Sequence, residues 1–219
     1  MDYNANKKVL YNYYCKNGLD DNFHKDNNYL ELAFSEINQL WQSNLNQIRE
    51  VKYIMIAEAP LWGEKRSYIY NPESRNSQFF YRNDLVNIMD RKLKSKSDFI
   101  HALNDIGLII VDVSPFCLNT ENTAVNYRKM TKLQYKNLVI DTLPCYFEQK
   151  ILAILPKKSP QCKVFFRYAR VKKTFENAIA DVLIKNSIIK ERNELNDISQ
   201  IGGGINKTKL SSIINNTAQ

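Results

Sequence analysis

Two acidic residues, Glu58 and Asp112, lie at the ends of the two most apolar stretches of the sequence. Glu58 directly follows residues 53–57 (YIMIA), and Asp112 lies near the end of residues 108–113 (LIIVDV). Continuous apolar runs of this length are typical of strands buried on both faces of a parallel sheet. The carboxyl ends of such strands share one edge, where open α/β proteins bind their ligands. We therefore expect both carboxylates to face a common cleft as catalytic residues.

Each acid also has an ordinary structural explanation. Glu58 could accept a hydrogen bond from a nearby backbone N–H, and Asp112 could be a turn or helix-cap acid before Ser114-Pro115. A charge attached to a buried strand must, however, be solvated or paired. This requirement favours a functional interpretation of both residues.

A glycine-rich and basic segment follows the last expected strand. Gly202–Gly204 precede Asn206, Lys207 and Lys209. Glycines allow a backbone to approach a phosphate closely, and the two lysines would supply positive charge. The segment lacks the spacing of a dinucleotide-binding fingerprint, and a plain flexible turn remains the alternative.

Basic residues also begin the helix expected over residues 170–185, and the whole chain has a formal net charge of +8. Arg167 and Arg170 would suit contacts with a nucleic-acid backbone, although a solvated helix start explains them equally well. The charge favours an anionic partner, with DNA as the first candidate.

Several other classes of site are poorly supported. The cysteines form no C-x-x-C pair, so we expect reduced thiols and neither a metal site nor a cofactor. His24 and His101 support no catalytic triad. We expect no signal peptide and no membrane association, and therefore a cytoplasmic protein. The four cysteines are Cys15, Cys117, Cys145 and Cys162.

The elements that would position these residues alternate between strands and helices. This order predicts an α/β fold, a three-layer α/β/α sandwich around a mostly parallel sheet of about four strands. We expect a single domain over residues 1–219, in which residues 1–26 form an N-terminal extension with a short helix and a surface loop. The expected strands are 53–57, 108–113, 163–169 and 197–201. The expected helices are 28–49, 82–93, 97–106, 132–155 with a break at Pro144, 170–185 and 208–214.

A long irregular segment over residues 61–76 separates the first strand from the next helix, and aromatic residues continue beyond it. Phe79 and Phe80 are adjacent, so an extended backbone would direct them to opposite sides. One could then stack on a ligand while the other joins the core. Core packing of both is the alternative.

Residues 57–61 (AEAPL) resemble, at their three central positions, the G-E-A-P-G motif of one branch of the uracil-DNA glycosylase superfamily. Members of this superfamily have an α/β/α sandwich around a four-stranded parallel sheet. The resemblance implies that Phe79 or Phe80 stacks on a flipped-out base. It also implies that Asp112 occupies the place of a residue, often Asn, that reads the base edge. Ala59, Pro60 and Ser114 would complete the substrate-binding set.

The chain departs from this family in two respects. It has no His-Pro-Ser motif near its end, so Asn206 or Lys207 would have to contact the base carbonyl instead. It also lacks the clustered N-terminal cysteines that ligate an iron–sulfur cluster in that branch, so we expect no such cluster.

The resemblance implies a DNA glycosylase-like protein that hydrolyses the N-glycosidic bond of a flipped-out base. The base need not be uracil, because an ionised Asp112 only accepts hydrogen bonds, whereas Asn both donates and accepts. One alternative is a non-catalytic nucleic-acid-binding or regulatory module with the same fold. Another is an α/β enzyme that modifies a small nucleotide or sugar.

Overall fold

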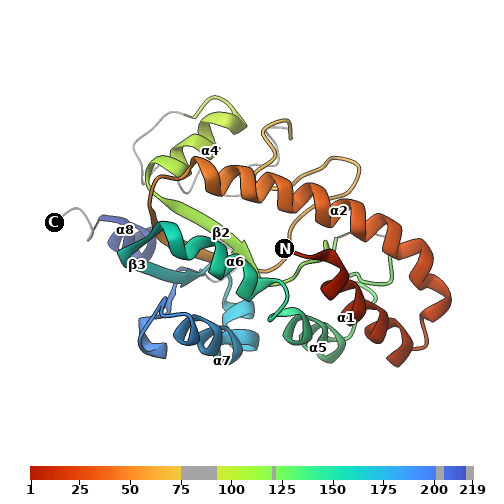
Figure 1. The fold of residues 1–219 in the computed structure, drawn as a ribbon. Coiled ribbons are helices and arrows are strands. Elements are labelled where there is room, and N and C mark those ends of the chain that lie inside the picture. Colours follow the sequence, from red (N-terminus) through yellow and green to blue (C-terminus); the bar gives the residue numbers. More distant parts are fainter. Residues whose placement is uncertain (75–92, 120–121, 201–204, 216–219) are drawn as a thin grey trace.

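The computed structural model describes residues 1–74, 93–119, 122–200 and 205–215, and it has an α/β fold (Figure 1). Four parallel strands form one sheet in the order β2-β1-β3-β4. The strands are β1 (Val51–Ala57), β2 (Leu108–Asp112), β3 (Lys158–Phe166) and β4 (Asn196–Asp197). The α-helices are α1 (Tyr3–Lys16), α2 (Asp20–Gln47), α4 (Lys96–Asp105), α5 (Lys132–Thr142), α6 (Phe147–Ile154), α7 (Ala169–Lys185) and α8 (Lys207–Asn215). Two short 3-10 helices, η2 (Leu155–Lys157) and η3 (Arg192–Glu194), precede β3 and β4.

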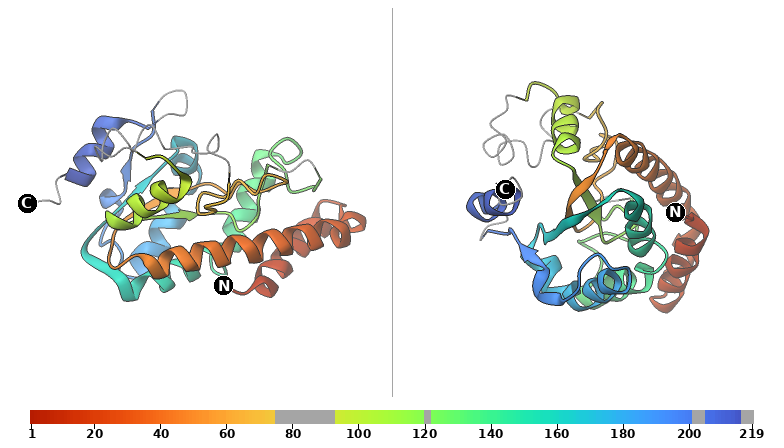
Figure 2. Two further views of the ribbon diagram at one scale, coloured as in Figure 1. Left: turned by 90° about the horizontal axis from the view of Figure 1, so that it is seen from above. Right: turned by 60° about the vertical axis from the view of Figure 1, so that its left-hand side comes forward.

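Helices cover both faces of the sheet, as the views in Figure 2 show. Helices α4 and α8 lie on one side, and α6 and α7 lie on the other. Two hydrogen bonds fasten α8 to the strands: the Tyr53 hydroxyl donates to the Ile214 carbonyl, and Lys163 Nζ donates to the Ile213 carbonyl. The helices that connect successive strands thus lie on opposite faces, α4 on one and α6 and α7 on the other. This placement matches the right-handed connections expected between parallel strands. The predicted three-layer arrangement is therefore confirmed.

The core strand β1 is hydrophobic because it has neighbours on both edges and helices on both faces. Six of its seven residues are buried, and only Lys52 is exposed. Its pairing runs from Tyr53 with Leu108 to Ala57 with Asp112 on one edge. On the other edge Ile56 pairs with Phe166. A chain with this environment has no reason to alternate apolar and polar residues.

Helix α2 runs beside the edge strand β2, and side chains satisfy the outward-facing polar groups of that strand. The indole N–H of Trp41 donates to the Ile110 carbonyl at 2.9 Å. The Ile110 N–H donates to the Tyr70 hydroxyl at 2.7 Å. Both backbone polar groups of this buried residue are therefore hydrogen-bonded to side chains, as buried backbone groups require.

The prediction of a surface loop within residues 1–26 is wrong, because α2 already begins at Asp20 and α1 packs against it. Leu10 and Tyr14 of α1 are fully buried. The Tyr14 hydroxyl donates to the Asp26 carboxylate at 2.6 Å, and the same oxygen accepts from the Ala124 N–H at 2.7 Å. The N-terminal segment is thus part of the hydrophobic core.

Several other boundaries differ from the predictions. Ser95 rather than Ser97 caps α4, in a reciprocal capping box with Asp98. Strand β3 begins at Lys158 and ends before Arg167, and β4 contains only two residues. The break near Pro144 is confirmed by the separation of α5 and α6. The helix predicted over 82–93 falls almost entirely outside the described residues.

No helix in the described parts of the chain is both long enough and apolar enough to cross a bilayer. The four cysteines are free thiols.

Replacing Gly107 by Ala should destabilise the protein more than replacing Gly18. Both glycines have a positive φ, at +74° and +64°. A Cβ on Gly107 would lie 2.4 Å from the Glu50 carbonyl oxygen, whereas a Cβ on Gly18 would meet nothing within 4 Å. We expect a loss of about 1 kcal/mol for Gly18→Ala and clearly more for Gly107→Ala in urea unfolding. Equal losses would contradict the tight contact at Gly107.

Candidate functional site

Backbone hydrogen bonds hold three strand ends side by side. The Ser114 N–H donates to the Glu58 carbonyl at 3.0 Å, and the Arg167 N–H donates to the Ile56 carbonyl at 2.9 Å. Ala57 pairs with Asp112 in the register of β1 and β2. The sheet itself therefore places Glu58, Asp112 and Arg167 at one edge.

A cavity of about 550 Å³ opens at this edge, which we call the strand-end cavity. Its volume lies within the range of small-molecule sites. The predicted residues that line the cavity come from the ends of three strands and from the start of α7. Two polar residues that follow β4, Ser199 and Gln200, also line it. The lining includes Glu58, Ala59, Pro60, Tyr68, Asp112, Tyr127, Arg167, Tyr168, Arg170, Ser199 and Gln200.

Glu58 is a buried carboxylate held by an ion pair. Its side chain is 9% exposed, and its Oε2 accepts a hydrogen bond from the guanidinium of Arg170, which is 65% exposed. The second carboxylate oxygen, Oε1, has no hydrogen-bond partner of normal geometry among the described residues. Burial and the nearby Glu58 both raise the pKa of the Tyr135 hydroxyl. Glu58 is thus anchored through one oxygen, while the other is buried and the hydroxyls of Tyr127 and Tyr135 lie close to the carboxylate.

Asp112 is buried more deeply and lies beside a lysine that sequence reasoning missed. Burial raises the pKa of Asp112 to about 6, although Lys150 and Tyr68 act in the opposite direction. The pKa of Lys150 is lowered by burial to about 7, and Asp112 opposes that shift. Lys150 lies on the short helix α6, directly after Glu148 and Gln149. The sequence pattern around it is that of an ordinary solvated lysine and gave no indication of its burial.

Two arginines differ in their environment at the cavity. Arg167 is buried, with its guanidinium 4.6 Å from the centre of the Tyr168 ring. The guanidinium of Arg170, the second residue of α7, lies 5.4 Å from the centre of the Tyr127 ring. Aromatic faces stabilise cations at such distances. Both arginines predicted to contact nucleic acid therefore lie at the cavity.

Four other predicted residues do not line the cavity. Ser114 is fully buried and hydrogen-bonds with Phe116 in the turn after β2. Asn206 accepts a hydrogen bond from the Lys209 N–H, so it caps α8. Lys209 pairs with Asp197 at 3.9 Å, and Lys207 is exposed at the start of the same helix.

The aromatic walls of the cavity come mostly from unexpected places. Phe79 and Phe80 lie outside the described residues, as do Gly202–Gly204. Tyr68 belongs to the expected aromatic segment, but Tyr127 and Tyr168 come from elsewhere in the chain. No periodicity or motif distinguishes these two tyrosines in the sequence.

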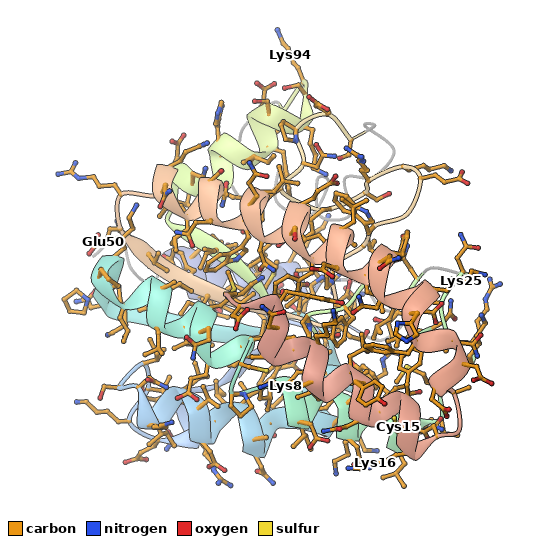
Figure 3. The ribbon with its side chains drawn as sticks, turned by 45° about the vertical axis from the view of Figure 1, so that its right-hand side comes forward. Lys8, Cys15, Lys16, Lys25, Glu50 and Lys94 are labelled. Atoms are coloured by element: carbon orange, nitrogen blue, oxygen red, sulfur yellow. The ribbon has the colours of Figure 1, made fainter. Side chains whose placement is uncertain are left out.

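Positive charge is also found on parts of the surface away from the cavity. Figure 3 shows Lys8, Lys16 and Lys25 on the helical layer formed by α1 and α2, and Lys94 at the turn before α4. These four lysines are exposed. The net charge therefore does not by itself define one binding face.

The described residues contain no cluster of three or more His, Cys, Asp or Glu side chains placed to hold a metal ion. Comparison with protein-family models, with curated proteins and with solved structures finds no match to the chain. The chemistry of the site must therefore be inferred from its own residues.

The stability of the protein should depend on the ionisation of Asp112. Its pKa in the folded protein is raised from the ordinary value of 3.8 to about 6, so the folded state binds the proton more tightly than the unfolded state. This contribution is fully present below about pH 4 and is lost as the pH rises through about 6. Relative to Asp112→Asn, the wild type should lose up to about 1 kcal/mol for each pH unit in this interval. Urea unfolding of both proteins between pH 4 and 8 measures the difference, and parallel profiles would contradict it.

Proposed function

We propose that the protein is a DNA glycosylase-like hydrolase that cleaves the N-glycosidic bond of a base held in the strand-end cavity. The observation that carries this proposal is the placement of two buried carboxylates, Glu58 and Asp112, from adjacent parallel strands on one cavity of about 550 Å³. The local resemblance of residues 57–61 to a glycosylase motif supports the same reaction.

The chemistry requires a negative charge next to the sugar. As the bond from the sugar C1′ to the base nitrogen breaks, its electron pair leaves with the base and positive charge develops on the sugar. The negative charge of the Glu58 carboxylate would stabilise this positive charge or orient a water molecule. The water oxygen then bonds to C1′, and its proton passes to the departing base or to solvent. Asp112 would accept hydrogen bonds from the base.

The arginines would bind the phosphate backbone of the nucleic acid. Arg170 is mostly exposed, so a phosphate can compete for its guanidinium while Glu58 remains attached to β1. A base deep in the cavity must be unstacked first, as in other enzymes that act on bases in DNA. Such binding would weaken steeply with added salt.

A second candidate function is non-catalytic binding of nucleic acid. It is favoured by the ion pair between Glu58 and Arg170, because this pair already neutralises the acid proposed to act on the sugar. A binding module would keep affinity for nucleic acid without releasing a base.

Replacing Glu58 by Gln should abolish base release while leaving DNA binding intact. We expect the rate of base release to fall by about 100-fold or more, because a transition-state charge loses its counter-charge. The measurement is alkali-induced cleavage at abasic sites, over single- and double-stranded DNAs with varied bases. Fluorescence anisotropy of the same DNAs reports binding.

Glu64→Gln is the matched control, because Glu64 is an exposed carboxylate outside the cavity lining. It should release bases at the wild-type rate. Salt-dependent binding of DNA with no base release from any substrate would support the binding module. Failure to bind DNA even at low salt would contradict both functions and favour a small-molecule substrate.

Replacing Asp112 by Asn should shift the base preference towards uracil. An amide both donates and accepts, and so it matches the O4 and N3–H groups of uracil, whereas a carboxylate only accepts. The same assay, run on a panel of bases, measures the ratio of rates for uracil and guanine. An unchanged ratio would contradict the role of Asp112 in reading the base.

A further inference from the structure

The amino group of Lys150 is fully buried and lies beside two aromatic rings. Its Nζ lies 4.8 Å from the centre of the Trp41 ring and 4.5 Å from the centre of the Tyr146 ring. It has no hydrogen-bond partner among the described residues. An unpaired buried amine would normally lose its proton, but two aromatic faces and a nearby carboxylate stabilise the charged form.

Asp112 ends β2, the strand against which α6 packs, and Lys150 and Asp112 act on each other electrostatically. Asp112 lines the cavity, whereas Lys150 and Tyr146 do not. Its Oδ2 has no hydrogen-bond partner of normal geometry among the described residues. A buried acceptor without a partner costs free energy unless a ligand or water satisfies it.

Six titratable groups act on Asp112 or lie close to it. One of them is Tyr127, which lines the same cavity. Lys150 and Tyr146 come from α6 and its N-terminal cap. Tyr68 and Tyr70 come from the segment after β1, and Glu58 comes from the end of that strand. Lys150 favours the ionised form of Asp112. The four tyrosines have raised pKa values, primarily because they are buried, so they stay neutral around pH 7.

We propose that Lys150 is a positioning residue that keeps Asp112 ionised, so that the cavity accepts hydrogen bonds from a base edge with adjacent N–H donors, as in guanine. This inference rests on the proposed function, because it assigns the base that the cavity takes. An ionised carboxylate offers two acceptor oxygens and no donor. The N1–H and exocyclic amino group of guanine offer two neighbouring donors.

Removing the charge of Lys150 would change which hydrogen-bonding groups of a base the cavity prefers. Without Lys150, burial and Glu58 would keep Asp112 protonated at higher pH, and a protonated carboxyl donates as well as accepts. The preference for two donors should then disappear around neutral pH. Lys150 acts on the base only through Asp112.

The binding test uses Lys150→Met, which retains the side-chain length and removes the charge. The probes are short labelled single strands that carry one guanine, hypoxanthine or uracil on a 2′-fluorinated sugar, which resists cleavage. Hypoxanthine lacks the exocyclic amino group of guanine. At pH 8 the wild type should bind the guanine probe about tenfold more tightly than the hypoxanthine probe, because the latter leaves one acceptor unpaired.

This preference should weaken in the wild type as the pH falls through about 6, and in Lys150→Met the midpoint should rise by about one pH unit or more. Lys172→Met is the control, because Lys172 pairs with Glu176 on α7 and lies outside the cavity lining. It removes the same charge and should leave the midpoint unchanged. An equal midpoint in wild type and Lys150→Met would overturn the proposal.

If no probe binds, that result would contradict the proposed function alone. Two further measurements still test whether Lys150 favours the ionised form of Asp112. Carbon-13 NMR titration of the Asp112 carboxyl should show a higher midpoint in Lys150→Met than in wild type, and equal midpoints would overturn the proposal. The second measurement is thermal unfolding. If Lys150→Met is too unstable to titrate, the double variant Asp112→Asn/Lys150→Met should melt at a higher temperature than Lys150→Met, because it leaves no unpaired buried charge. A double variant that melts no higher would also overturn the proposal.

Discussion

The pairing of β1 with a neighbour on each edge is the constraint on which the site depends. Because parallel strands are held in a fixed register, Ala57 lies beside Asp112, and Ile56 lies beside Phe166. The residues that follow, Glu58 and Arg167, must then meet at the same edge. Loops can vary around such an edge without moving these groups, since their backbones belong to the sheet.

This rigid edge also concentrates buried charge. Glu58 and Asp112 are both less than 10% exposed, and each has a cation from a different helix, Arg170 from α7 and Lys150 from α6. Buried ionic groups seldom stabilise a fold more than apolar residues of the same size would. Their presence at one cavity is therefore better explained by the chemistry of a ligand than by folding. The two cations differ in that Arg170 is exposed to solvent, whereas Lys150 is fully buried.

The apolar strands and the acids at their ends could be predicted from the sequence because they follow from local pattern and from the geometry of parallel sheets. Residues 53–57 and 108–113 have no alternation, and the structure confirms both as strands. Lys150, Tyr127 and Tyr168 could not be predicted, because their role depends on which distant elements pack beside them. The start of α2 was missed for a different reason: residues 20–27 are polar on most faces, and their helix is stabilised by packing against α1.

The two hydrogen bonds that Trp41 and Tyr70 make to Ile110 have a consequence for association between copies of the chain. An open outer strand is a template on which another molecule can add a strand of its own. At the middle of β2 both backbone groups are already occupied, so an incoming strand would have to displace two large buried side chains. At the opposite border β4 is only two residues long, which offers little length for such pairing. The sheet is in this way closed to extension from either side, although it is not a barrel.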